Sequence, residues 1–223
     1  AYWQFDTSGT GWFSIINNVD YLYPEVSKCP YPKAGTTNSA AKIGFISAKG
    51  GATTWLPIPG DARNNYLPRM EFIPNSNTMF IQQMNREQNT NKIWTYTIGQ
   101  DDLKNIYVDQ DKAWVETNNN IHWIQNKKQT WFTFMSERSG YRHMYRVLAD
   151  GSKTEAITQG NFDFISEVGF DMKRGFVYFM ATENNFTQRY LYRAKIWGNG
   201  ECERLTPIEQ NGTHNYRMSP TCD

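Results

Sequence analysis

The stretch from Ser136 to His143 holds the densest set of groups in the sequence that could do acid–base chemistry. Glu137, Arg138, Arg142 and His143 lie close together there, around Gly140. A carboxylate, two guanidinium groups and an imidazole at this spacing would suit proton transfer or the binding of a charged substrate. The same letters also fit a hairpin turn, in which these side chains are solvated or paired across strands. The surrounding elements decide between the two interpretations.

The three histidines offer no second route to catalysis. His122, His143 and His214 lie at unrelated points, and none belongs to an H-x-x-x-H or H-E-x-x-H pattern. Lone histidines on strands are usually satisfied polar groups. The sequence therefore predicts no metal ion, no cofactor and no catalytic histidine.

Four aspartates, Asp101, Asp102, Asp109 and Asp111, form a loose acidic segment. A calcium loop alternates oxygen ligands around a glycine at a fixed position, and this segment lacks that glycine. We expect a solvated loop.

The cysteines are too few and too far apart for a zinc ribbon or a thioredoxin-type pair. The sequence contains Cys29, Cys202 and Cys222. We expect three free thiols, with a Cys202–Cys222 disulfide as the alternative.

Composition narrows the class of protein. The 223 residues carry a net charge of +1, and the basic residues are scattered, so nucleic acid is not an expected partner. No apolar run reaches the roughly 18 residues of a membrane span. Because the chain opens on Ala1 with strand-like text, we expect a segment of a longer protein.

A pattern of about 40 to 50 residues recurs three times, beginning at Met70, Ile121 and Val168. Each copy has a short apolar strand, a longer aromatic strand, an alternating strand and a short outer strand. Equivalent tyrosines mark the third strand of each copy: Tyr96, Tyr145 and Tyr192. Four strands per repeat are typical of the blades of a β-propeller.

We therefore predict an all-β fold, a β-propeller segment of about three full four-stranded blades and most of a fourth, in a single partial domain over residues 1–223. The predicted parts are a partial blade at 1–60, blades at 66–115, 116–165 and 166–208, and the first strand of a further blade at 209–223. The stretch around Gly140 becomes a turn between the second and third strands of a blade.

Two short motifs carry a resemblance to a known family. "YPKAG" follows the strand "AYWQFD", and "SGYRHMY" lies in a later blade. In this order and spacing they resemble the propeller domain of dipeptidyl peptidase IV and its relatives in the prolyl oligopeptidase family, the bacterial members in particular. The motif residues, which we interpret as structural, are Tyr31, Pro32, Lys33, Ala34, Gly35, Gly140, Tyr141, Arg142 and His143.

The resemblance implies a larger enzyme, in which an eight-bladed propeller caps an α/β-hydrolase domain of the same chain. Such an enzyme uses a Ser, Asp, His triad to remove N-terminal dipeptides with Pro or Ala in second position. The implied partners are peptide substrates, the hydrolase domain and a second copy in a homodimer. The implied location is periplasmic, or secreted to the cell envelope.

The chemistry of that family is missing from this sequence. There is no G-x-S-x-G nucleophile elbow and no adjacent Glu-Glu pair, which the family uses to capture the substrate amine. We predict no catalytic residue here, and a segment that gates and shapes substrate access.

One connection is a candidate for contact with substrate. In the family, the segment after a Trp-Val pair reaches toward the substrate cavity, and this sequence has that pair at Trp114 and Val115. The residues that follow, "ETNNNIH", depart from the aromatic and basic residues of vertebrate members. The candidate cavity residues are Trp114, Val115, Glu116 and Asn118.

A second function is open at this stage. A propeller is also a common platform for binding proteins or carbohydrates without catalysis, because a fold does not specify a function.

Overall fold

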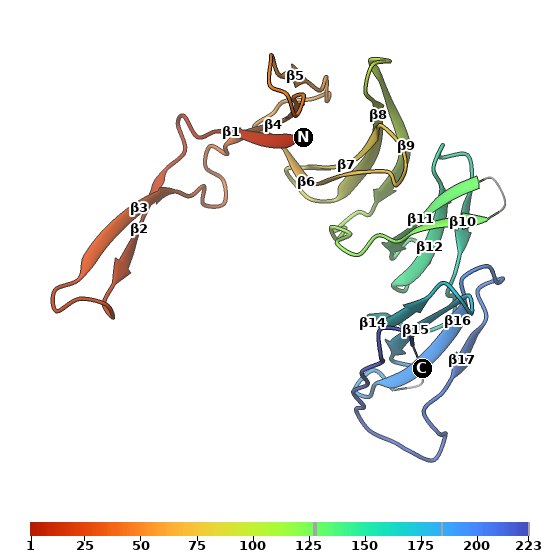
Figure 1. The fold of residues 1–223 in the computed structure, drawn as a ribbon. Coiled ribbons are helices and arrows are strands. Elements are labelled where there is room, and N and C mark those ends of the chain that lie inside the picture. Colours follow the sequence, from red (N-terminus) through yellow and green to blue (C-terminus); the bar gives the residue numbers. More distant parts are fainter. Residues whose placement is uncertain (127–128, 184, 223) are drawn as a thin grey trace.

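The regular secondary structure of the described residues is β-strand. The structure, a computed structural model, describes residues 1–126, 129–183 and 185–222. Those ranges contain no helix, and therefore no helix long enough to span a membrane. The strands form four sheets that follow one another along a curved path, with a two-stranded hairpin projecting from the first (Figure 1).

Three of the sheets have four antiparallel strands, which pair in chain order. We number them as blades 2 to 4. Blade 2 consists of β6 (Asn65–Phe72), β7 (Thr78–Asn85), β8 (Thr90–Thr97) and β9 (Asp102–Gln110). Blade 3 consists of β10 (Trp123–Asn126), β11 (Gln129–Ser136), β12 (His143–Leu148) and β13 (Thr154–Ala156). Blade 4 consists of β14 (Phe164–Asp171), β15 (Phe176–Ala181), β16 (Tyr190–Lys195) and β17 (Cys202–Arg204).

Blade 1 has three strands, β1 (Tyr2–Asp6), β4 (Ala40–Phe45) and β5 (Thr54–Trp55). Between β1 and β4 the chain leaves the blade as a hairpin of β2 (Trp12–Asn17) and β3 (Glu25–Pro30), which we call the arm (Figure 1). Three full blades and most of a fourth confirm the predicted propeller segment.

The period-2 alternation of the strands explains why the blades stack. On β7, Met79 and Ile81 pack in a cluster with residues of blade 1, while Phe80 between them packs in a cluster with Phe132 and Phe134 of blade 3. Successive side chains of a strand point to opposite faces, so a strand with apolar residues at every position buries both. Each blade is therefore held by apolar contacts with its neighbours.

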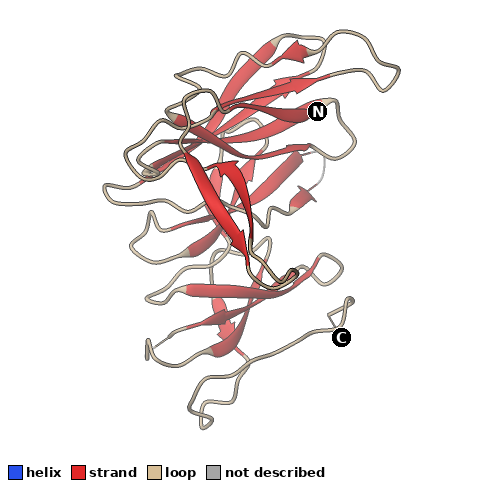
Figure 2. Cartoon of the chain, turned by 90° about the vertical axis from the view of Figure 1, so that its left-hand side faces the viewer, coloured by secondary structure: helices blue, strands red, loops and turns tan. Residues whose placement is uncertain are grey.

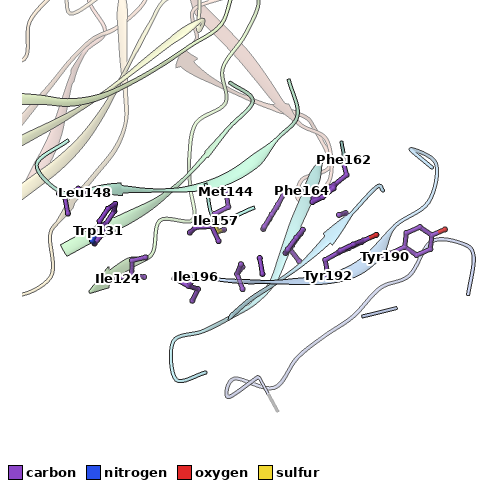
Figure 3. Close-up of a cluster of buried hydrophobic side chains, with 14 residues drawn as sticks. Ile124, Trp131, Met144, Leu148, Ile157, Phe162, Phe164, Tyr190, Tyr192 and Ile196 are labelled. Carbon is purple, nitrogen blue, oxygen red and sulfur yellow. The ribbon is translucent and has the colours of Figure 1, made fainter. Parts of the chain in front are cut away.

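The largest of these clusters lies between blades 3 and 4 (Figure 3). Aromatic rings dominate it, and Phe164 and Phe179 stack with their centroids 4.5 Å apart. Burying one such side chain contributes about 1.5 to 3 kcal/mol. The cluster comprises Ile124, Trp131, Met144, Leu148, Ile157, Phe162, Phe164, Val177, Phe179, Ala181, Tyr190, Tyr192, Ala194 and Ile196.

Arg146 joins the same two blades by polar contacts. Its guanidinium donates to the carbonyl oxygens of Ile196 and Gly198 in blade 4 and pairs with Glu155 at 2.7 Å. The charge lies near the rings of Trp131 and Trp197, 6.0 and 5.3 Å from their centroids. A buried guanidinium with this many partners fixes one blade against the next.

The segment after blade 4 differs from the predicted strand at 209–223. Among its described residues, 209–222, the only backbone bridge joins Thr213 to Arg189, and the segment is drawn as loop in Figure 2. Apart from that bridge, the described residues of the segment join no sheet. It packs instead against blade 4, with Met218 and Cys222 close to Gly169.

All three cysteines are free thiols, so the Cys202–Cys222 disulfide is not formed. Cys202 lies on β17, where its thiol is 3.3 Å from the carbonyl oxygen of Gly200. Cys222 lies beside Gly169 of β14.

Candidate functional site

The four candidate cavity residues all lie on the connector between blades 2 and 3, residues 111–122. The structure divides them into two pairs. Trp114 and Glu116 face outward, and the Trp114 indole N–H donates to Glu116 Oε1 at 3.0 Å. Val115 and Asn118 are buried, and the Val115 amide donates to the carbonyl oxygen of Gln88 at 2.9 Å. Only the outward pair is free to meet a ligand.

Asn118 holds the connector between the two blades. Its Oδ1 accepts from the Met135 amide at 2.5 Å, and its Nδ2 donates to the Met135 carbonyl oxygen at 3.1 Å. Its own backbone amide and carbonyl are bound by the side chain of Gln82, at 3.3 and 2.7 Å. Both ends of the Asn118 amide are thus paired inside the protein, and its contact with substrate stays a prediction.

A polar cavity of about 300 Å³ lies between the connector and the first half of β14. Exposed Asn119 and Asn120 lie on its connector side, and Ser166 and Glu167 lie on its blade 4 side. Amide, hydroxyl and carboxylate groups of this kind can hydrogen-bond a peptide backbone or a polar side chain. The cavity is lined by Glu116, Thr117, Asn118, Asn119, Asn120, Met135, Arg142, Met144, Phe164, Ile165, Ser166 and Glu167.

His122 ends the connector and fixes one carboxylate of this cavity. Its Nε2 lies 2.8 Å from Glu167 Oε2, and its ring stacks on Phe170 with the centroids 3.8 Å apart. The Glu167 carboxylate of blade 4 is therefore held by the end of the connector rather than left free. Sequence reasoning missed Glu167, since its partner lies 45 residues away.

The second motif positions the wall of the cavity. Arg142 Nη1 donates to the carbonyl oxygens of Phe164 and Ile165, at 3.4 and 3.2 Å, so it supports the start of β14. Arg142 thus holds a blade-to-blade contact and is not the simply solvated or cross-strand-paired side chain expected of it.

His143 is fully enclosed beside this wall. Its two ring nitrogens lie 3.2 Å from Thr158 Oγ1 and 3.0 Å from the Gly160 carbonyl oxygen. Burial lowers the pKa of His143, so the ring is neutral near pH 7. A neutral imidazole whose two nitrogens are both paired serves as a structural link.

Asp109 also departs from the solvated loop predicted for the acidic segment. It lies on β9 with only 5% of its surface exposed, and Ser136 donates to its Oδ1 at 2.5 Å. Arg138 lies 3.4 Å from the same oxygen and stacks over the ring of Tyr107. Desolvation raises the pKa of Asp109. The position of Asp109 in an alternating strand, "NIYVDQ", is the signal that could have placed it inside.

The first motif, Tyr31–Gly35, forms the turn from the arm back to blade 1. The Tyr31 amide donates to the Gly11 carbonyl oxygen at 2.8 Å, and the exposed Tyr31 ring packs on Phe13. Gly35 has φ +77°, a conformation that favours glycine. The extended path past Tyr31 and the turn at Gly35 agree with the role expected from the prolines.

These residues together form a set of polar and charged groups that could bind a ligand. Among the described residues, no group of three His, Cys, Asp or Glu side chains could hold a metal ion. The site offers a polar cavity, an outward tryptophan and carboxylates.

Comparison with known proteins supplies the wider context for this site. The sequence model of the protein family described as the dipeptidyl peptidase IV (DPP IV) N-terminal region matches residues 1–223. The chain belongs to this family.

The relatives of this DPP IV N-terminal region are larger proteins. The crystal structure of Porphyromonas gingivalis dipeptidyl peptidase 4 superposes with a TM-score of 0.81 at 26% identity, over 98% of this chain and 30% of that one. A probable dipeptidyl peptidase 4 of Aspergillus fumigatus is 23% identical over 93% of this chain and 28% of its own length. The mouse protein named inactive dipeptidyl peptidase 10 is 26% identical over 86% of this chain and 26% of its own length. The chain thus spans less than a third of the length of each of these three relatives.

Proposed function

We propose that this DPP IV N-terminal region is part of the propeller of a serine exopeptidase that removes N-terminal dipeptides with Pro or Ala in second position. The match of the family model to the whole chain carries this proposal. The likeness to a solved dipeptidyl peptidase 4 supports it. In this function the propeller segment gates and shapes access to a catalytic domain of the same polypeptide.

The cavity beside the connector supports a role in substrate access. Its lining of Asn119, Asn120, Ser166 and Glu167 suits the hydrogen-bonding groups of a peptide better than an apolar ligand. The outward Trp114 and Glu116 extend the same surface. The peptide substrate is the partner that this lining favours.

The test is hydrolysis of a Gly-Pro chromogenic amide by the full-length protein, with this segment alone as the control. We expect release of the chromophore by the full-length protein only. A Gly-Gly amide, which lacks the proline, should be cut far more slowly. A well-folded full-length protein that cuts neither amide would overturn the proposal.

A non-catalytic propeller that binds proteins or carbohydrates is the second candidate. The similarity to a mouse relative whose name describes it as inactive favours this alternative. It predicts a full-length protein that does not hydrolyse the Gly-Pro amide and that still binds its partner through the propeller.

The arm supports a homodimer. A two-stranded hairpin alone is only marginally stable in water, and this one exposes large apolar side chains on both strands. Among them, Trp12 is 69% exposed, and Leu22 in the turn is 92% exposed. Two copies would cover identical surfaces in a two-fold pair, the commonest arrangement of soluble oligomers.

Ile16 and Val26 face each other across the arm and give a direct test of the dimer. We expect the protein to sediment as a dimer and the double variant Ile16→Glu, Val26→Glu to sediment as a monomer with unchanged circular dichroism. Glu substitutions of Lys28 and Ser14, another cross-strand pair of the arm, serve as a polar-position control. A native monomer, or a dimer that survives the first variant, would contradict this role of the arm.

We also propose a bacterial protein located in the periplasm or secreted to the cell envelope. The similarity to a Porphyromonas gingivalis structure supports the bacterial source, and the location is the one that the family resemblance implies. Cell fractionation followed by immunoblotting tests the location, and recovery in the cytoplasmic fraction alone would refute it.

A further inference from the structure

A second, smaller cavity lies beside the connector, next to the polar cavity. It is enclosed by the end of β9, the connector and the turn between β11 and β12. Glu116, Met135 and Arg142 line both cavities. The smaller one has a volume of about 20 Å³, which is room for one or two groups the size of a water molecule.

The floor of this cavity holds a buried carboxylate with an unused oxygen. The Asp109 side chain is 6% exposed, and its hydrogen bonds from Ser136 and Arg138 both reach Oδ1. Among the described residues no donor reaches Asp109 Oδ2. The Oδ2 atom keeps contact with solvent, so it is open to a hydrogen bond from a group bound in the cavity.

The rim adds an aromatic face and further negative charge. Trp114 is 48% exposed, with its indole N–H directed to the Glu116 carboxylate. Exposed Asp111 and Glu137 also line the cavity. An indole face beside carboxylates is the usual surroundings of a bound ammonium group.

The two arginines of the cavity already have partners in the protein. Arg138 donates to Ser136, Asp109 and the Val108 carbonyl oxygen. Arg142 donates to two backbone carbonyls of blade 4. Four carboxylates against two guanidinium groups leave the lining with a net negative charge, whereas the whole chain carries +1.

We propose that this cavity is a subsite for a primary ammonium group, the side chain of a lysine in a bound peptide, with Asp109 at its floor and Trp114 and Glu116 at its rim. An ammonium group is a compact donor of three hydrogen bonds, whereas a guanidinium is planar and larger. The small volume therefore selects lysine over arginine. The assignment of the peptide as a substrate rests on the proposed peptidase function, and the ammonium subsite itself does not.

The test is a titration followed by the indole N–H signal of Trp114 in a nitrogen–proton correlation spectrum, assigned with the variant Trp114→Phe. The probes are N-acetyl-lysine methylamide, its norleucine isostere and N-acetyl-arginine methylamide. We expect a saturable shift with the lysine probe only. No shift with the lysine probe, or an equal shift with norleucine or arginine, would overturn the proposal.

Variants of the acidic groups locate the charge. Asp109→Asn and Glu116→Gln each keep the side-chain shape, and we expect about tenfold or greater weakening of lysine binding in Asp109→Asn and a smaller loss in Glu116→Gln. Asp102→Asn, a half-buried position on the same strand whose side chain pairs with Lys104, should bind as the unaltered protein does. Unchanged binding in both Asp109→Asn and Glu116→Gln would refute the assignment.

The readout involves no hydrolysis, so it separates the two proposals. A protein that binds the lysine probe without cutting a Gly-Pro amide would support the ammonium subsite and contradict the peptidase function. A protein that cuts the amide and does not bind the lysine probe would support the peptidase function and contradict the ammonium subsite.

Discussion

Replacing Asn118 by alanine should loosen the connector from blade 3. Strand β10 begins at Trp123, which pairs with Phe132, so β11 has no backbone partner on that side around Met135. The Asn118 amide supplies the missing donor and acceptor there. Asn118→Ala therefore leaves one amide and one carbonyl of β11 unpaired in a half-buried position.

The expected cost follows from those two groups. Leaving a buried donor or acceptor unpaired costs about 1 to 3 kcal/mol, and water reaches part of this edge, so we expect a total of about 2 to 3 kcal/mol. For a domain of this size, that loss lowers Tm by about 4 to 12 °C.

Urea unfolding followed by tryptophan fluorescence, together with a thermal melt, measures the change. Asn119→Ala is the matched control, because it removes the same kind of side chain from the next, exposed position. Its cost should stay within about 0.5 kcal/mol. Equal stabilities of the two variants would refute the view that Asn118 anchors the connector.

Three further predictions concern backbone approach, protonation and thiol reactivity. Gly151→Ala should destabilise the protein by about 1 to 3 kcal/mol more than Gly175→Ala. Both glycines have positive φ, but only a Cβ at position 151 would meet a carbonyl oxygen, that of Ile106, at 2.2 Å. Equal costs of the two variants in urea unfolding would contradict this packing. Burial lowers the pKa of His143, so the unfolded chain takes up the proton first as the pH falls below about 6.5, and the free energy of unfolding should drop from pH 7 to 5. His143→Gln should reduce that drop in paired denaturation curves. An unchanged drop would argue against a buried neutral ring. Burial raises the pKa of the Cys202 thiol to about 11, so this thiol should react slowly in a disulfide-exchange assay of the folded protein at pH 8. Cys202→Ser should therefore remove no fast-reacting thiol from the folded protein and one thiol from the unfolded protein. Loss of a fast-reacting thiol from the folded protein would show that Cys202 is accessible.

The blades were predictable because their signal is local and repeated. Tyr96, Tyr145 and Tyr192 were aligned by spacing alone, and the structure places them on β8, β12 and β16, all buried. Alternation within eight or fewer residues identifies a strand, and recurrence of the unit identifies the propeller. Neither inference requires knowledge of distant contacts.

The arm and the last segment were harder to predict for different reasons. The arm is rich in apolar residues that normally indicate a buried strand, yet Ile15 and Ile16 are both more than half exposed. The sequence of residues 209–222 resembles that of a strand, yet these residues join no sheet in the structure. Sequence patterns report what a segment can form, whereas pairing depends on what lies beside it.

The candidate site was located by sequence but not resolved into its parts. The Trp114–Val115 pair marked the right connector, while the inward or outward direction of each side chain depends on Gln82 and Met135, which lie 36 and 17 residues from Asn118. Asp109 likewise gains its buried character from Ser136 of the next blade. Contacts between blades decide which polar residues face a ligand, and these contacts leave no local pattern.

The arm departs from its blade and returns to it at adjacent positions, since Asp6 of β1 pairs directly with Ala40 of β4. A short turn could join these two residues without altering the sheet. The length and sequence of the arm can therefore diverge between related proteins while the blade beneath it stays constant. The same junction offers a place where a foreign loop can be grafted, or the arm trimmed, with the rest of the propeller intact.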